Sequence, residues 1–142
     1  MNIKRLILAI VAGYVVIFLT DFLIHEKWMM ADYEATQQLW RAKPEMGSFM
    51  GWMIGAQVLS VVTFVILWAM GTGSRTPTVA CAIVFGALMG MFSGVWAIVM
   101  YVVMPLPCPI ACKWFFAGIA QCILLGIVTF FVYKPNQATT GT

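Results

Sequence analysis

The chain has 142 residues, of which 63% are apolar and only 9% charged, and its mean hydropathy is +0.96. A soluble domain carries about 25% charged residues, so this chain has too little polar surface to cover a globule in water. Its net charge of +3 comes from few side chains and provides no basic patch of the kind that nucleic-acid binding needs. The composition therefore excludes a soluble domain and a nucleic-acid-binding protein, and it indicates a protein embedded in lipid.

Four apolar segments follow one another along the chain, at residues 6–24, 50–70, 78–104 and 114–133. Each is close to or above the roughly 20 residues that a helix needs to cross the hydrocarbon core. None alternates polar and apolar residues as a membrane β-strand would. We therefore predict an all-α, integral membrane four-helix bundle that forms one domain over residues 1–135, followed by a polar, disordered tail at residues 136–142.

The basic residues that flank the spans predict the orientation of the bundle. With the N-terminus inside the cell, four basic residues lie on each side, so the count alone is balanced. Lys4 and Arg5 lie directly before the first span, which usually dominates, and all five acidic residues fall on the opposite side. We therefore predict that both termini are cytoplasmic and that the long loop between the first two spans lies outside.

The first span ends with two ionisable side chains, Asp21 and His25, spaced one helical turn apart. At this spacing a carboxylate can hydrogen-bond to an imidazole and orient it, and ionisable groups within a membrane are costly and often functional. One interpretation is a structural pair that ties the first helix to a neighbour, for instance through Gln57 or Gln121. The others are a proton-handling or ligand-binding site, and a metal site, although even with Glu26 the set is one or two ligands short.

The loop at residues 26–49 contains a stretch without Gly or Pro, residues 28–41, which is suited to a helix. The first helix either continues through this stretch or breaks near Lys27 and is followed by a separate helix on the membrane surface. In the second case Tyr33 and Trp40 are interfacial anchors. In the first case one stripe of a single helix carries Asp21, His25, Trp28, Asp32 and Thr36.

Glycines recur at every fourth residue at the start of the second span and in the middle of the third. The two series are Gly47, Gly51 and Gly55, and Gly86, Gly90 and Gly94. Such a strip lets a second helix backbone approach closely, and this van der Waals contact is a principal source of helix association in lipid. Each strip either packs against a helix of the same chain or faces another subunit.

The cysteines divide into two pairs. Cys81 and Cys122 lie within spans, where cysteine behaves as a small apolar residue. Cys108 and Cys112 lie just before the fourth span on the predicted outer side, where a disulfide is permitted. They form a disulfide, remain free thiols, or serve metal or redox chemistry, for instance soft copper binding with His25 and nearby methionines. No cofactor is predicted.

The end of the first span and the loop after it carry a further pattern. It consists of the run DFLIH, then Tyr33, Thr36, Leu39-Trp40-Arg41 and Pro44-Glu45-Met46. With its glycine-rich third span and the closing pair Tyr133-Lys134, the chain resembles a group of small four-pass bacterial membrane proteins of unknown function. The resemblance implies a multi-pass protein of the bacterial inner membrane and the importance of Asp21, His25, Trp40 and Arg41, and it implies no activity.

These features predict an accessory or structural subunit that associates laterally with a larger membrane complex or with itself. The spans carry little charge and show no catalytic constellation, so no enzymatic activity is predicted. One alternative is an independent small binder or transporter that uses the outer Asp21–His25 site. Another is thiol or copper chemistry at Cys108 and Cys112. The predicted partners are the lipid bilayer and other membrane subunits or further copies of the chain.

Overall fold

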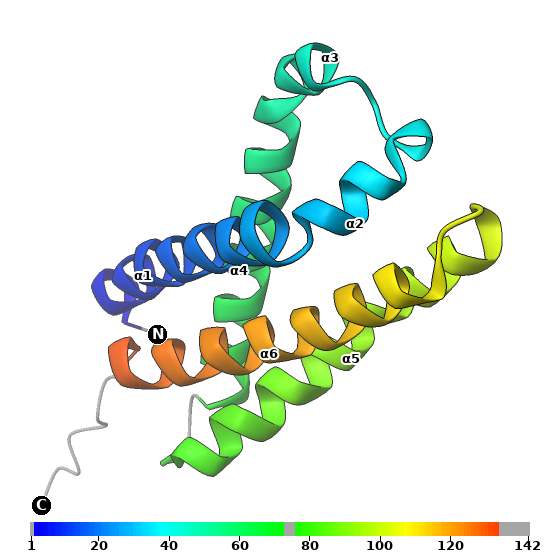
Figure 1. Cartoon of the computed structure of the whole chain (residues 1–142). Coiled ribbons are helices and arrows are strands. Elements are labelled where there is room, and N and C mark those ends of the chain that lie inside the picture. The colour runs from blue at the N-terminus through cyan, green and yellow to red at the C-terminus, as the bar shows by residue number, and fades with distance from the viewer. Residues whose placement is uncertain (1, 73–75, 134–142) are drawn as a thin grey trace, which may run out of the picture.

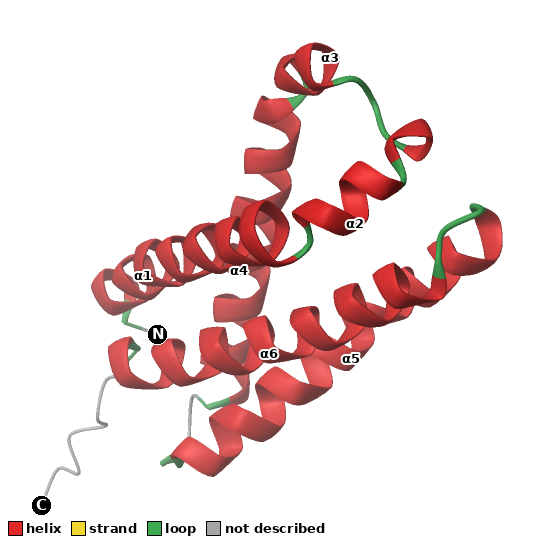
Figure 2. Ribbon diagram, viewed as in Figure 1, coloured by secondary structure: helices red, strands yellow, loops and turns green. Residues whose placement is uncertain are grey.

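The computed structural model describes residues 2–72 and 76–133, and every regular element within them is helical (Figure 2). Four helices are long and apolar enough to cross a membrane: Ile3–Trp28, α4 (Met50–Gly71), α5 (Val79–Val103) and α6 (Cys108–Val132). This confirms the predicted all-α membrane fold with four spans. The polar tail predicted at residues 136–142 lies outside the described residues.

The first span combines an α-helix, α1 (Ile3–Asp21), with a π-helical turn, η1 (Phe22–Trp28), that continues it. The π-turn is wider than an α-turn, and it closes where the Met29 N–H donates to the Ile24 carbonyl, five residues earlier, at 2.9 Å. Met29 has φ −102° and ψ 0°, which are not helical values. The first span therefore stops at Trp28 and does not run on into the loop.

Three short helices connect the first span to the second. They are α2 (Met30–Ala35), the 3-10 helix η2 (Gln37–Leu39) and α3 (Lys43–Ser48). Figure 1 shows α2 beyond the end of the first span and α3 apart from it, at the start of α4. Because the chain breaks at Met29, the residues of α2 do not continue the stripe that a single long helix would present.

The closest packing in the fold joins α5 and α6, which lie side by side (Figure 1). Gly86, Gly90 and Gly94 all lie buried on the face of α5 that meets α6. A Cβ added to Gly90 would lie 2.6 Å from the Ile119 Cα, and one added to Gly86 would overlap with the backbone of Cys122. The two backbones approach this closely because no side chain stands between them.

The second span, α4, packs against the other spans with only half of its length. Its second half contributes the buried residues Val61, Phe64, Val65, Trp68 and Ala69. In its first half, residues 50–60, every residue is exposed except Gln57, which is half-buried. A Cβ added to Gly47, Gly51 or Gly55 would have no heavy atom within 4 Å. In Figure 1, α4 crosses the direction of α1 steeply, so that its start stands away from α5 and α6.

The beginning and the end of the described chain lie together at one end of the molecule. Leu6 and Ala9 of α1 share a buried apolar cluster with Trp68, Ala82 and Tyr133. Figure 1 shows the N-terminus close to the last turns of α6. We call the opposite end, which carries α2 and η2, the capped end.

Replacing Gly90 with Leu should destabilise the α5–α6 hairpin, because a side chain there would have to separate two backbones that are in contact. Overpacking of this kind costs about 1–3 kcal/mol of folding free energy. Thermal unfolding of the purified protein in mild detergent, followed by circular dichroism, measures the loss.

Gly118 of α6 offers a matched control, since a Cβ added there has no heavy atom within 4 Å. Gly118→Leu should keep or raise the melting temperature, because Leu forms helix better than Gly by somewhat less than about 1 kcal/mol. Equal melting temperatures for Gly90→Leu and Gly118→Leu would contradict the packing described above.

Candidate functional site

The carboxylate of Asp21 lies where α1, α4 and α6 meet. Gln57 of α4 donates a hydrogen bond to its Oδ2 at 2.5 Å, and Gln121 of α6 donates to its Oδ1 at 2.6 Å. Gln121 also donates to Thr20 Oγ1 at 2.9 Å. A carboxylate within a span is costly unless donors replace its water, and here each oxygen receives an amide proton from a different helix. We call Asp21, Gln57 and Gln121 the Asp21 junction.

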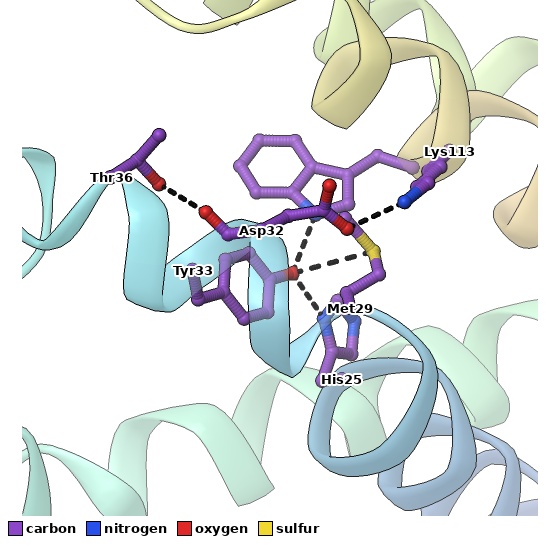
Figure 3. A network of polar contacts seen from close by, with 7 residues as sticks. His25, Met29, Asp32, Tyr33, Thr36 and Lys113 are labelled. Carbon is purple, nitrogen blue, oxygen red and sulfur yellow. Dashed lines mark hydrogen bonds and ion pairs between the residues drawn. The ribbon is translucent and has the colours of Figure 1, made fainter.

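His25 lies in η1, and its ring contacts Tyr33 of α2 (Figure 3). His25 Nδ1 is 2.6 Å from the Tyr33 hydroxyl oxygen, and the two rings stack with 5.9 Å between their centroids. Trp114 Nε1 donates to the same hydroxyl at 2.7 Å, and the hydroxyl lies 3.6 Å from Met29 Sδ. Three side chains thus converge on one oxygen atom.

The hydroxyl of Tyr33 has one proton to donate, and it accepts from the Trp114 indole, which can only donate. If His25 Nδ1 carries no proton, Tyr33 donates to it. If Nδ1 is protonated, it donates to Tyr33, and the Tyr33 proton turns to the Met29 sulfur. Burial raises the pKa of the Tyr33 hydroxyl above its usual value of 10.0, although the hydrogen bond from Trp114 lowers it. The hydroxyl therefore keeps its proton near neutral pH, and His25 is held in one orientation in both of its protonation states.

Further contacts fix residues 29–40, which we call the cap, to the start of α6. Lys113 Nζ lies 2.6 Å from Asp32 Oδ2 (Figure 3). The Trp40 ring lies edge-on to Tyr33 and to Trp114, with centroid separations of 5.3 and 5.9 Å. A small apolar cluster of Met29, Leu106, Ile110 and Ala111 is buried at the same place. Tyr33 and Trp40, the interfacial anchors of the alternative with a separate helix, are half-buried against the start of α6.

A small cleft lies between η1 and α6, beside the His25 ring. It is lined by Ile24, His25, Trp114, Ala117 and Gln121 and has a volume of about 110 Å³. A water molecule occupies about 30 Å³ of liquid, so the cleft has room for a few waters or for one small polar group. Gln121 connects the cleft to the Asp21 junction. His25 lines the cleft while its Nδ1 is engaged by Tyr33, which leaves Nε2 as the ring nitrogen for a molecule in the cleft.

The two residues expected to pair, Asp21 and His25, have different partners. The Asp21 carboxylate accepts hydrogen bonds from Gln57 and Gln121, whereas His25 Nδ1 is hydrogen-bonded to the Tyr33 hydroxyl. The π-turn accounts for this difference. In a wider turn, a residue four positions further on no longer lies where it would lie in an α-helix.

The other two predicted site residues are placed apart from each other. Trp40 belongs to the cap, where its Nε1 donates to Thr36 Oγ1 at 2.9 Å. Arg41 is exposed, pairs with Glu45 at 2.6 Å and lies 4.5 Å above the Phe49 ring. The extended backbone of Trp40 (φ −112°, ψ 154°) turns the chain out of the cap, so Arg41 follows the segment that leads into α4.

The cysteines lie outside this site. Cys108 and Cys112 are free thiols on the first turn of α6, with their sulfur atoms 3.8 Å apart. Cys81 is exposed and Cys122 is half-buried. Within residues 2–72 and 76–133, no group of three or more His, Cys, Asp and Glu side chains is placed to hold a metal ion.

Sequence reasoning named Gln57 and Gln121 but missed the hydrogen bonds of His25. Tyr33 and Trp114 are 81 positions apart, and their contact depends on the π-turn and on the break at Met29. The sequence allowed a break near Lys27 as one of two alternatives, but no residue pattern marks the π-turn. The ion pair of Lys113 with Asp32 could not be predicted either, because in the sequence each residue is an ordinary charged residue near the end of a helix.

Comparisons with protein-family models, with curated proteins and with solved structures give no match for this chain. The structure supports one part of the resemblance to small four-pass bacterial proteins, namely the four helices that are able to span a membrane. The function of the protein is inferred from its geometry.

Double-mutant cycles on thermal stability in detergent should separate the two sets of contacts. Asp21→Asn with Gln57→Leu should be coupled, and so should His25→Gln with Tyr33→Phe, because each pair shares a hydrogen bond. Residues in contact typically show coupling of about 0.5–3 kcal/mol. Asp21→Asn with His25→Gln should be coupled more weakly than either of these pairs, because no hydrogen bond joins the two side chains.

The exposed pair of Arg41 and Glu45 is the control for these cycles. Its coupling should be no more than about 0.2–1 kcal/mol, because solvent screens a surface ion pair. Strong coupling between Asp21 and His25, with none between Asp21 and Gln57, would show that the partners are wrongly assigned.

Proposed function

We propose that this protein is a small accessory or structural subunit of a bacterial inner membrane, which associates laterally with a larger membrane complex or with further copies of itself. The observation that carries the proposal is the first half of α4, residues 50–60. A Cβ added to any glycine of its strip would have no heavy atom of the described chain within 4 Å.

The chain contains two glycine strips of the same spacing in different surroundings. On α5, Gly86 and Gly90 meet the backbone of α6, whereas on α4 a Cβ at Gly51 or Gly55 meets nothing within 4 Å. Glycine costs a helix about 1 kcal/mol relative to alanine, so a strip that only faces lipid loses stability and gains no contact. The exposed glycine strip of α4 therefore favours an interaction with a helix from another protein chain.

The side chains around this strip also suit a protein partner. Trp52 is 81% exposed and Leu59 is 66% exposed, and Ile54 and Val58 are exposed on the same side of the helix. Aromatic residues are enriched at protein interfaces, where large apolar side chains fill pockets of the partner. Together with the glycines they form a surface with both a flat strip and large apolar side chains next to it.

Gln57 supports the same conclusion, because it shows which way the helix faces. It is the one residue of 50–60 that is not exposed, and it donates to Asp21. At 100° per residue, Gln57 lies about 160° around the helix from Gly55. The hydrogen bond to Asp21 therefore holds the Gln57 face of α4 against the end of α1, while the opposite face, which carries the glycines, stays exposed.

The proposal includes the orientation predicted from the sequence. Lys4 and Arg5 directly before the first span favour a cytoplasmic N-terminus. Both ends of the described chain lie at the same end of the molecule, so the capped end would then face outward.

The cleft beside His25 favours a second candidate function, a small binder that takes an uncharged ligand able to hydrogen-bond to His25 Nε2. Its support is the combination of apolar walls with polar atoms of His25 and Gln121. A molecule that co-purifies with the wild type and is lost from His25→Gln, with assembly unchanged, would favour this candidate over the first.

Gly51→Leu and Gly55→Leu test the proposed association. Both variants should lose the high-mass species on native gels, or the co-purifying membrane protein, after extraction of native membranes in mild detergent. Their melting temperatures as isolated chains should not fall, because the described chain has no atom near either position. Mass spectrometry of the native bands identifies what is lost.

Gly118→Leu is again the matched control, since it makes the same substitution at another open position. It should leave assembly unchanged. A wild-type protein that migrates as a monomer with no stoichiometric partner, or glycine variants that assemble like the wild type, would contradict the proposed function.

A further inference from the structure

Cys108 and Cys112 lie one turn apart at the start of α6, and both are exposed. Their sulfur atoms are 3.8 Å apart. Residues four apart in an α-helix have Cα atoms about 6 Å apart, which lies within the range of about 4.4–6.8 Å that disulfides span. A disulfide also needs Cβ atoms about 3.5–4.5 Å apart, closer than the roughly 5–6 Å between residues four apart on a helix. Closing the bond therefore requires a small local adjustment of the first turn of α6, and the strain this leaves makes the bond easier to reduce.

The other side of the same turn is held by the cap. Ile110 and Ala111 are buried there with Met29. Lys113, the next residue after Cys112, forms the ion pair with Asp32. The turn thus keeps its shape, and the thiols stay side by side, without a covalent bond between them.

The thiols lie at a level of the molecule that water reaches. The side chains of Lys113 and Asp32 in the neighbouring ion pair are 30% and 24% exposed, and Lys113 Nζ lies 5.4 Å above the Trp28 ring. Lysine and tryptophan at the end of a span are typical of the membrane–water interface. A water-soluble reagent can therefore meet Cys108 and Cys112 on the exposed side of the helix.

We propose that Cys108 and Cys112 form a reversible dithiol–disulfide pair that exchanges electrons with small-molecule disulfides. The thiolate of one cysteine attacks one sulfur of the small disulfide and forms a mixed disulfide, while the other half leaves as a thiolate and takes a proton. The thiolate of the second cysteine then attacks the first cysteine's sulfur, forms the Cys108–Cys112 bond and releases the remaining half. The pair has lost two electrons and two protons, and the small disulfide has become two thiols; the reverse reaction restores the dithiol.

A structural disulfide would have little to hold in place here. A disulfide stabilises a protein mainly by restricting the unfolded chain, and more so for longer loops. This one would close a segment of only five residues, 108–112, whose helical turn is already fixed by its contacts with the cap. A bond that the fold does not need can open and close without unfolding the protein, which is the property that redox exchange requires.

Oxidised glutathione is a suitable probe for the purified wild-type protein in detergent. It should convert the pair into an internal disulfide and release two molecules of reduced glutathione per pair, with no glutathione left on this segment. Dithiothreitol should restore both thiols. Peptide mass mapping under non-reducing conditions follows each step, and the half-buried Cys122 serves as an internal control that should remain unmodified.

Single substitutions should stop the reaction halfway. Cys108→Ser and Cys112→Ser should each retain one glutathione as a mixed disulfide, because the second thiol is missing. The oxidised and reduced wild-type proteins should melt at nearly the same temperature. Thiols that stay free, glutathione retained on both cysteines of the wild type, or a rise in melting temperature of more than about 5 °C on oxidation would overturn the proposal, the last because it would mark a structural disulfide.

Discussion

A single carboxylate within the apolar bundle determines how three of the four spans meet. Asp21 needs hydrogen-bond donors in place of water, and Gln57 and Gln121 supply one for each oxygen. The two amides are polar groups within spans as well, so each would be costly to bury alone. Because the three side chains satisfy one another, α1, α4 and α6 meet at one level. The α5–α6 hairpin, which packs through glycine contacts, is thereby joined to α1 and α4.

The capped end adds a second set of polar contacts with a different role. His25, Tyr33 and Trp114 hold η1, the cap and α6 together through one hydroxyl oxygen, and the ion pair of Lys113 with Asp32 supports them from the side. These contacts use the inward side of the first turn of α6. The outward side carries Cys108 and Cys112, so the cap that fixes the turn also sets the distance between the two thiols.

Much of this fold follows from the sequence, because the length and apolarity of the four segments require membrane-spanning helices. Gln57 and Gln121 were predictable candidates for Asp21, since they are the amides within spans. The two glycine strips, in contrast, have the same local pattern, and only the steep crossing of α4 leaves one of them open. The partner of His25 could not be predicted either, because the π-turn and the break at Met29 decide which side chain it meets.

The account depends most on the open face of α4, and site-specific photo-crosslinking in native membranes tests that face directly. A photoreactive residue would be placed in turn at each position from 50 to 60. Positions 51, 55 and 58 share one helical face, so they should crosslink to a second protein chain. Positions 53 and 60 lie on other sides of the helix and should not. Equal yields of protein crosslinks at all positions, or none at 51, 55 and 58, would contradict the proposed lateral association.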